Sequence, residues 1–196
     1  APQLRLLNLS TAQAVEQLRQ HPARPKASVC WWHLLQDHST LDPLAPGWTI
    51  TPVLGSIADR QALRAGLRDG VLQAVSVHHS PIDREEQMLP LDQRSPGVAG
   101  YQAVLPALWQ ALVAGDGWQP SELWQALSWG PSAFLAQEPE ALQPGSQRWL
   151  LFDPEQAHQP RAGSLAANAP LPAQALKGQL LASGLLPAEQ WSLDQG

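Results

Sequence analysis

Short apolar segments alternate with amphipathic segments along most of this chain, and that alternation constrains its fold more than any other feature. The apolar segments are rich in β-branched and aromatic residues and are predicted to be strands, at 4–9, 26–35, 47–55 and 71–80. Strands of nearly continuous apolar character that alternate with helices are typical of a parallel sheet with both faces covered. The sequence therefore predicts an α/β fold.

The helical segments carry their own start and stop signals. Ser10 with Gln13, and Ser56 with Asp59, have the spacing of a capping box, in which two side chains satisfy the first free N–H groups of a helix. Gly70 then marks the end of the second of these helices. Two more helical patterns, each ending in a glycine, follow at 101–117 and 120–130.

The charge balance excludes some classes of partner. The chain has 12 Lys and Arg residues against 17 Asp and Glu residues, a net charge of −5, and no stretch concentrates the cations. Neither a nucleic acid nor an anionic membrane is therefore expected as a partner. The single cysteine, Cys30, cannot form an internal disulfide, and we expect neither a signal peptide nor a membrane-spanning segment. We therefore expect a cytoplasmic protein in which Cys30, inside an apolar strand, is buried packing rather than a nucleophile.

The last third of the chain has a different composition. A Pro-, Gly- and Gln-rich stretch at 136–147 precedes a short predicted strand at 148–154, and the rest is polar, alanine-rich and weakly periodic. We therefore divide the chain into residues 1–140 and a small C-terminal β segment with loops at 141–196.

One long segment, DRQALRAGLRDGVLQAVSVHHSPIDREEQMLPLDQRSPGVAGYQAVLPALWQAL (59–112), resembles the late-barrel region of dihydroorotases and related cyclic amidohydrolases. That family has there a helix, a strand ending in Asp-His-x-Pro-His, an acidic loop and a Pro-Gly-x-x-Gly turn, in this order. Four shorter stretches resemble the fifth, sixth and seventh strand segments of the family and the return of its chain to a β-sandwich: LLNLSTAQAVEQL (6–18), SVCWWHLL (28–35), TPVLGSIADRQAL (51–63) and GSQRWLLFDPEQ (145–156).

The resemblance implies the C-terminal half of a (β/α)₈ TIM-type barrel. Residues 1–140 would be the half barrel, with strands five to eight and their helices, and residues 141–196 a β-sandwich-type segment and tail. The first four strands of the family, which supply a His-x-His pair and a bridging lysine to its metal centre, have no counterpart in these residues.

The resemblance also indicates what an active member of the family has at each position of the reaction site. A metal-binding histidine of the fifth strand corresponds to Asn8, and the sixth-strand histidine of a Pro-His-His-Leu pattern corresponds to Trp32. The aspartate that binds metal and moves a proton corresponds to His78, and a substrate-side histidine corresponds to Ile82. A substrate-holding Asn-Pro-Pro-Leu-Arg stretch corresponds to TPVLG, residues 51–55.

These replacements remove the chemistry that hydrolysis of a cyclic amide needs. A carboxamide is a poor zinc ligand compared with imidazole, and indole is only a donor. Loss of general acid–base catalysis alone lowers a rate by about 10²–10⁴-fold, and loss of the metal removes the nucleophile as well. We therefore expect no catalytic residue, no metal ligand and no cofactor in this chain, in contrast to the zinc expected in active relatives.

A remade metal site is the alternative, with His33 and His78 as ligands and His38 or His79 joining them. Adjacent strand residues face opposite sides, so His78 and His79 cannot bind one ion from the same face. The neighbouring tryptophans would also crowd such a site. We favour the structural reading, in which His78 fills the space of the lost centre and His79 is a hydrogen-bonded core residue.

Three functions remain open at this point. In the resembling family, some bacteria carry an inactive dihydroorotase-like chain that assembles with the aspartate transcarbamoylase catalytic chain and holds its trimers in a larger complex. The first hypothesis is such a non-catalytic structural subunit in pyrimidine biosynthesis. The second is an active, metal-dependent dihydroorotase with an altered metal site, and the third is a binding protein that keeps a vestigial ligand pocket.

Other features have a structural reading beside a functional one. The acidic run at 83–87 is expected to be solvated surface, and Gly97 and Gly100 are expected to form a turn. Several tryptophans are expected to face outwards, where a partner protein could contact them: Trp109, Trp118, Trp124, Trp129 and Trp149. Because a half barrel leaves strand edges unpaired, we expect either a longer polypeptide or a homodimer that pairs those edges.

Overall fold

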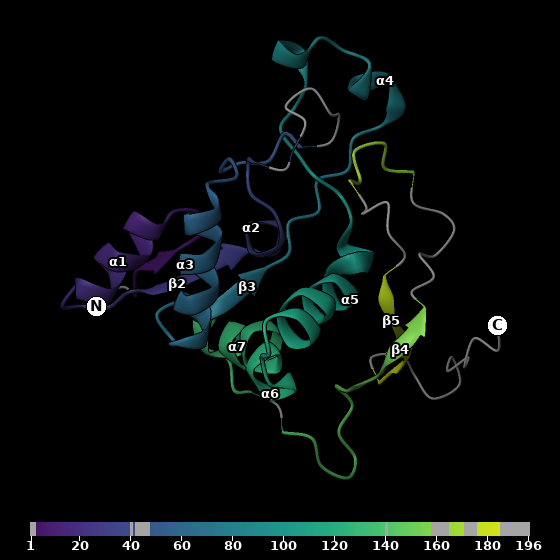
Figure 1. The fold of residues 1–196 in the computed structure, drawn as a ribbon. Helices are drawn as coiled ribbons and strands as arrows, with labels where there is room; N and C mark the ends of the chain where they lie inside the picture. Colours follow the sequence, from purple (N-terminus) through teal and green to yellow (C-terminus); the bar gives the residue numbers. More distant parts are fainter. Residues whose placement is uncertain are drawn as a thin grey trace.

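The centre of the fold is a three-stranded parallel sheet. A computed structural model of the chain describes residues 3–39, 41, 48–139, 141–157, 165–170 and 176–184. The strands β1 (Arg5–Leu6), β2 (Lys26–Cys30) and β3 (Ala74–Ser76) lie in the order β1-β2-β3 (Figure 1). Arg5 pairs with Lys26, and Val29 pairs with Val75. The predicted α/β fold with parallel strands is confirmed.

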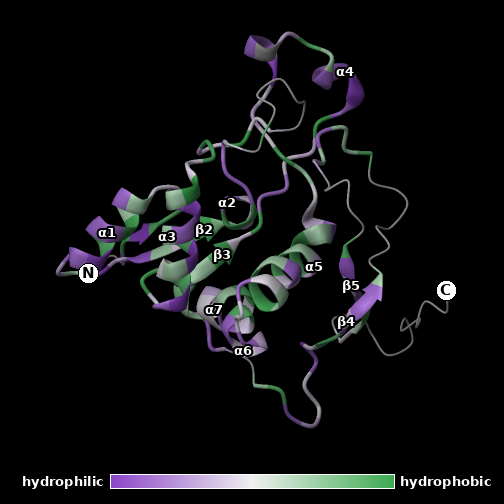
Figure 2. Cartoon of the chain, in the orientation of Figure 1, coloured by the Kyte–Doolittle hydropathy of each residue, from purple (hydrophilic) through white to green (hydrophobic). Residues whose placement is uncertain are grey.

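Two helices cover one side of this sheet. In Figure 1, α1 (Ala12–Gln20) and α3 (Ile57–Arg68) lie side by side next to the strands. They approach closely at Gly66, where a Cβ atom would lie 3.0 Å from a methyl carbon of Val15. Their buried leucines join β2 in one core, and Figure 2 shows β2 and β3 in hydrophobic colours. Helix packing therefore buries the apolar faces that the sequence pattern predicted.

The helices α1 and α3 share one carboxylate, that of Asp59, at their starts. The capping box of Ser56 and Asp59 is confirmed at the start of α3. The start of α1 differs from the prediction, because Thr11, and not Ser10, accepts the N–H of Ala14. Asp59 explains this shift, since its second carboxylate oxygen accepts the Ala12 N–H at 2.7 Å and fixes the chain one residue further on.

Two predicted strands are corrected. Segment 47–55 is not a strand in its described part, 48–55: β2 pairs directly with β3, and Thr49 makes only an isolated antiparallel bridge to Gly97. Segment 26–35 becomes β2 followed by the short helix α2 (Trp31–Leu35). A helical turn lets four consecutive side chains, Trp31 to Leu34, all be buried, whereas a strand would turn alternate ones outwards. In the described residues the parallel sheet thus has three strands instead of the expected four, and β1 and β3 are shorter than predicted.

The helical patterns at 101–117 and 120–130 are confirmed, with one changed boundary. The first contains η2 (Tyr101–Ala103), α5 (Val104–Leu108) and the π-helical η3 (Trp109–Gly115). The second contains α6 (Pro120–Trp124), the π-helical η4 (Gln125–Trp129) and α7 (Gly130–Phe134), so it does not end at Gly130. A Cβ atom at Gly130 would lie 1.8 Å from the Gln73 carbonyl oxygen. Glycine is used there for close approach to the sheet and not as a helix end.

The remaining elements lie at the periphery. The short helices α4 (Arg84–Gln87) and η1 (Leu91–Gln93) follow β3, and Figure 2 shows α4 in hydrophilic colours. The strands β4 (Leu150–Ala157) and β5 (Lys177–Ser183) form a separate antiparallel pair, and β5 packs against α5. Among the residues described, no helix has both the length and the apolar character needed to cross a membrane.

Replacing Asp59 should destabilise the fold more than replacing another helix-capping aspartate. Hydrogen bonds from the Ala12 N–H and from Ser56 lower the pKa of the Asp59 carboxyl. Asp59→Ala should reduce the free energy of unfolding by about 1–3 kcal/mol, because it leaves the N–H groups of Ala12, at the start of α1, and of Ser56, the N-cap of α3, without their side-chain partner. Urea unfolding would measure this. Asp83→Ala, at the start of the exposed α4, is the matched control and should cost less than about 1 kcal/mol; equal losses would contradict the linking role of Asp59.

The same pKa shift gives a pH dependence. Because the Asp59 pKa is lower in the folded chain than in the unfolded chain, its contribution to stability is present above about pH 4 and is lost as the pH falls through the folded value. Below about pH 4, the free energy of unfolding measured in urea should therefore fall more for the wild type than for Asp59→Ala.

Candidate functional site

The carboxyl ends of the parallel strands bring together residues from three distant parts of the sequence. This edge of a parallel sheet is where α/β proteins place their sites. Asn8 follows β1 with a positive φ of 58°, a conformation that asparagine tolerates better than most residues. Ser28 holds this turn, since its hydroxyl oxygen accepts the Asn8 N–H at 3.2 Å and its carbonyl accepts the Leu9 N–H at 2.8 Å.

The Asn8 side chain connects the end of β1 to the end of β3. Its Oδ1 accepts a hydrogen bond from the Ser76 hydroxyl at 2.6 Å, which leaves its Nδ2 to face Nε2 of His78 at 2.7 Å. In this orientation of the carboxamide, Nδ2 donates and Nε2 of His78 accepts, so an uncharged ring carries its hydrogen on Nδ1. The Nε2 lone pair of His78 is therefore engaged by Asn8.

His33 lies behind this group and is almost fully buried, with 2% of its surface exposed. Its Nε2 lies 3.0 Å from the Pro52 carbonyl oxygen and 3.3 Å from that of Val53, so Nε2 carries the hydrogen and donates. Burial lowers the pKa of the His33 imidazole, and the nearby His78 ring lowers it further. His33 is thus a neutral ring whose Nδ1 is buried and has no hydrogen-bond partner.

Tryptophan rings fill the space beside His33. The Trp31 and Trp32 ring centroids are 3.9 Å apart, and Trp48 meets Trp32 edge-on at 5.0 Å. Trp32 is buried, and its indole N–H, like that of Trp31, has no hydrogen-bond partner. Cys30 is also buried, as predicted, and burial raises the pKa of its thiol. The position where the family resemblance implies a metal ligand therefore contains a packed indole.

These residues do not fit a zinc ion. In the described part of the chain, no group of three His, Cys, Asp or Glu side chains is placed to hold a metal. His38, a possible additional ligand in the alternative metal site, is exposed after the end of α2, where its backbone N–H donates to the Gly55 carbonyl. A structural or catalytic zinc site needs three or four protein ligands. The rings of His33 and His78 alone fall short of that number.

The prediction that His79 is a core histidine is wrong. His79 is exposed, because β3 ends at Ser76 and the chain no longer alternates between two faces of a sheet there. Its ring meets the edge of Tyr101, with centroids 4.6 Å apart. Both rings line an open hollow of about 560 Å³, which the Asp83 and Glu86 side chains also border. The prediction that the 83–87 run is charged surface is confirmed in α4, which has no buried residue.

A buried asparagine that the sequence did not suggest anchors the loops after β3. Asn168 is 1% exposed; its Nδ2 donates to the carbonyls of Ser80 (2.9 Å) and Gly97 (3.0 Å), and its Oδ1 accepts the Ile82 N–H at 3.0 Å. Ile82 is itself buried and so packs in this junction. The turn predicted for Gly97 and Gly100 is also found here, with a φ of 124° at Gly100. No local pattern around Asn168 could have indicated this role, because its partners lie far away in sequence.

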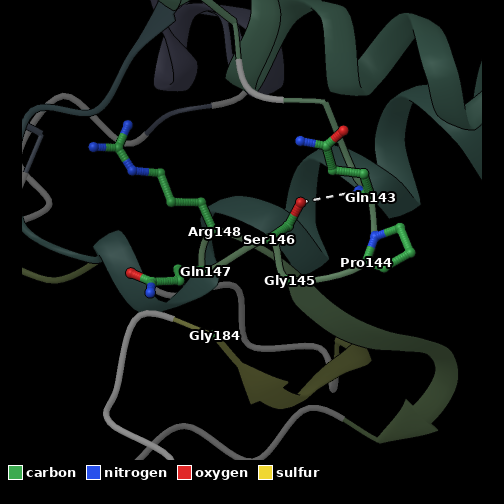
Figure 3. A pocket seen from close by; sticks show the side chains of 7 residues that line it. All are labelled: Gln143, Pro144, Gly145, Ser146, Gln147, Arg148 and Gly184. Atoms are coloured by element: carbon green, nitrogen blue, oxygen red, sulfur yellow. Dashed lines mark hydrogen bonds between the residues drawn. The ribbon is translucent and has the colours of Figure 1, made fainter.

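Two further hollows lie away from the strand ends. One, of about 420 Å³, lies in the loop before β4 and is bordered by Gln143, Ser146, Arg148 and Gly184 (Figure 3). The Ser146 hydroxyl accepts the Gln143 N–H there, so the loop is closed by its own hydrogen bond. The other, of about 310 Å³, is apolar and contains three of the predicted partner-facing tryptophans: Trp109, Trp124 and Trp129. Trp118, by contrast, is buried, and Trp149 is half-buried.

Comparison with curated proteins gives dihydroorotase relatives. A probable dihydroorotase-like protein of Synechocystis is 36% identical over 118 residues, which are 55% of this chain and 27% of that protein. A dihydroorotase of Listeria welshimeri is 30% identical over 119 residues, 59% of this chain and 28% of its own. A dihydroorotase-like protein of Pseudomonas putida is 30% identical over 95 residues, 48% of this chain and 22% of its own. The chain thus spans about a quarter of the length of the curated relatives it matches. No protein-family model matches it.

Comparison with solved structures shows the fold. An L-hydantoinase (dihydropyrimidinase) from Arthrobacter aurescens superposes with a TM-score of 0.78 at 17% identity, over 92% of this chain and 43% of that one. A D-hydantoinase from Bacillus sp. AR9 gives 0.75 at 19% identity, with the same coverage. The chain therefore has the fold of part of a TIM-barrel-type amidohydrolase, and its relatives support kinship with the cyclic amidohydrolases.

Cys30 should react slowly with a thiol reagent in the folded chain. Its thiol is buried, and the raised pKa keeps it protonated at neutral pH. We expect the reaction with Ellman's reagent to be slower by about 10³-fold or more than in 8 M urea, because only about 10⁻³–10⁻⁶ of a stable domain is open at a given time. A folded-state rate close to the urea rate would show an accessible, reactive thiol and would contradict this assignment.

Proposed function

We propose that this chain is a non-catalytic, dihydroorotase-like structural subunit that supports assembly of an aspartate transcarbamoylase complex in pyrimidine biosynthesis. In this proposal residues 1–140 derive from the C-terminal half of a (β/α)₈ barrel, and residues 141–196 form a β-sandwich-type segment. The chain has no metal cofactor, and its partner is the transcarbamoylase catalytic chain in the cytoplasm.

The hydrogen bond from Asn8 to His78 carries the proposal that the chain is non-catalytic. Hydrolysis of a cyclic amide at neutral pH needs a Lewis acid and a group that moves a proton. At the strand ends, one imidazole lone pair is bound to a carboxamide, and an indole fills the neighbouring position. Neither side chain supplies a metal ligand or a carboxylate.

The scaffold role rests on what the chain retains. Its helices and their caps do not use Asn8 or His78, and Trp32, at another position of the reaction site, is packed in the aromatic core. Surfaces made by helices and loops can therefore persist after catalysis is lost. The identity of the partner rests on the family resemblance to inactive dihydroorotase-like chains that assemble with aspartate transcarbamoylase.

Co-migration with the transcarbamoylase catalytic chain tests this proposal. We expect a mixture of the two purified proteins to elute from a size-exclusion column as one larger species. We also expect the complex, with zinc added, to turn over neither dihydroorotate nor carbamoyl aspartate. The opposite results are separate elution, which would refute the partner, and zinc-dependent turnover, which would refute the non-catalytic assignment.

One observation favours a second candidate function, an active metal-dependent amidohydrolase with an altered site. The Nδ1 atom of His33 is buried and unpartnered, so its lone pair is free. In that case His33 and His78 would both bind the ion, and the Asn8 to His78 hydrogen bond would have to break. Variants distinguish the two functions: His33→Ala would abolish metal-dependent turnover in the second and leave co-migration unchanged in the first.

A further inference from the structure

A basic hollow lies at the opposite end of the sheet from the candidate site. It has a volume of about 320 Å³ and surrounds the amino ends of β1 and β2. Four of its lining residues carry basic side chains, namely Arg5, His21, Arg24 and Lys26. None of its described lining residues is acidic, although the chain as a whole has a net charge of −5. The fold thus gathers cations in one place on an otherwise acidic protein.

The loop between α1 and β2 carries two of these groups, His21 and Arg24, and Lys26 follows it at the start of β2. The loop sequence, HPARP (21–25), contains two prolines, which restrict the backbone. The Ala23 N–H donates to Nδ1 of His21 at 3.2 Å, so an uncharged His21 ring carries its hydrogen on Nε2 and remains a donor. Arg24 has a positive φ of 39°, which is uncommon for arginine, and its N–H donates to the His21 carbonyl at 3.1 Å.

Arg5 completes the hollow from the first strand. Its guanidinium carbon lies 6.0 Å from the centroid of the Phe134 ring, and its Nη2 donates to Gln3 at 3.2 Å. Its Nε is buried and has no hydrogen-bond partner. Lys26 donates to the Ala133 carbonyl, so it retains further N–H groups. In the described residues no carboxylate forms an ion pair with these cations, whereas Arg19, Arg60, Arg64 and Arg68 all pair with acids.

We propose that this hollow, formed by Arg5, His21, Arg24 and Lys26, is a binding site for the phosphate group of a small molecule. A phosphate monoester carries a charge of about −1.5 to −2 at pH 7 and has three acceptor oxygens, which suits a hollow lined by four basic side chains. A single carboxylate would leave most of this charge uncompensated. The size of the hollow suits a phosphate group with a small organic portion. The site lies at the amino ends of the strands and is independent of the proposed function.

Calorimetric titration with inorganic phosphate tests the site. At fixed ionic strength, we expect one saturable site per chain, with binding weakened at least about tenfold in Arg24→Gln, because one charge-assisted hydrogen bond is lost. Arg24 is exposed, so this variant should fold, which its thermal unfolding curve would verify. Arg24→Lys keeps the charge and should lose less.

Two controls make the result specific. Arg84→Gln removes the same charge from α4, outside the hollow, and should bind phosphate within about twofold of the wild type. Acetate, a single carboxylate, should bind more weakly than phosphate at equal ionic strength. The proposal would be overturned by the absence of saturable binding at millimolar phosphate, by equal weakening in both arginine variants, or by acetate that binds as tightly as phosphate.

Discussion

The hydrogen bond between the Asn8 carboxamide and the His78 imidazole determines what the strand ends can do. It joins the first and third strands of the sheet across a residue separation of 70, and Ser76 fixes its direction by donating to the other end of the carboxamide. Asn8 is half-buried and His78 is exposed, so binding a cation at His78 Nε2 would break one hydrogen bond and leave the Asn8 Nδ2 group without this partner.

The packing behind this hydrogen bond supports the same conclusion. The Trp31, Trp32 and Trp48 rings fill the interior beside His33, and burial keeps the His33 ring neutral. Charge is therefore excluded from the place where an amidohydrolase would concentrate it. Arg5, His21, Arg24 and Lys26 lie at the amino ends of the strands, where they line the proposed phosphate site.

Local signals in the sequence predicted the elements that depend on neighbouring residues. The Ser56 and Asp59 capping box, the end of α3 at Gly70 and the burial of Cys30 all follow from short-range patterns. Long-range contacts decided the rest. Asp59 moves the start of α1 by one residue, and Gly130 serves close packing against Gln73 instead of ending a helix. The predicted strand at 47–55 was wrong because β2 and β3 pair directly, which no pattern within that segment reveals.

The candidate site shows the same division. The family resemblance pointed to Asn8, Trp32 and His78, and the structure places Asn8 and His78 in contact. The family resemblance could not give the tautomer of His78, which depends on a residue 70 positions away. Nor could it give the burial of Asn168 between two loops. Pairwise geometry of this kind arises only in the folded chain.

Nitrogen-15 NMR of the imidazole rings during a zinc titration would test the central claim most directly. At pH 8, where imidazole is ordinarily uncharged, we predict that His78 carries its hydrogen on Nδ1 and that one equivalent of zinc leaves its Nε2 resonance unchanged. A stoichiometric shift of both His78 Nε2 and His33 Nδ1 on zinc addition would show that the two rings bind the ion, and would contradict the account.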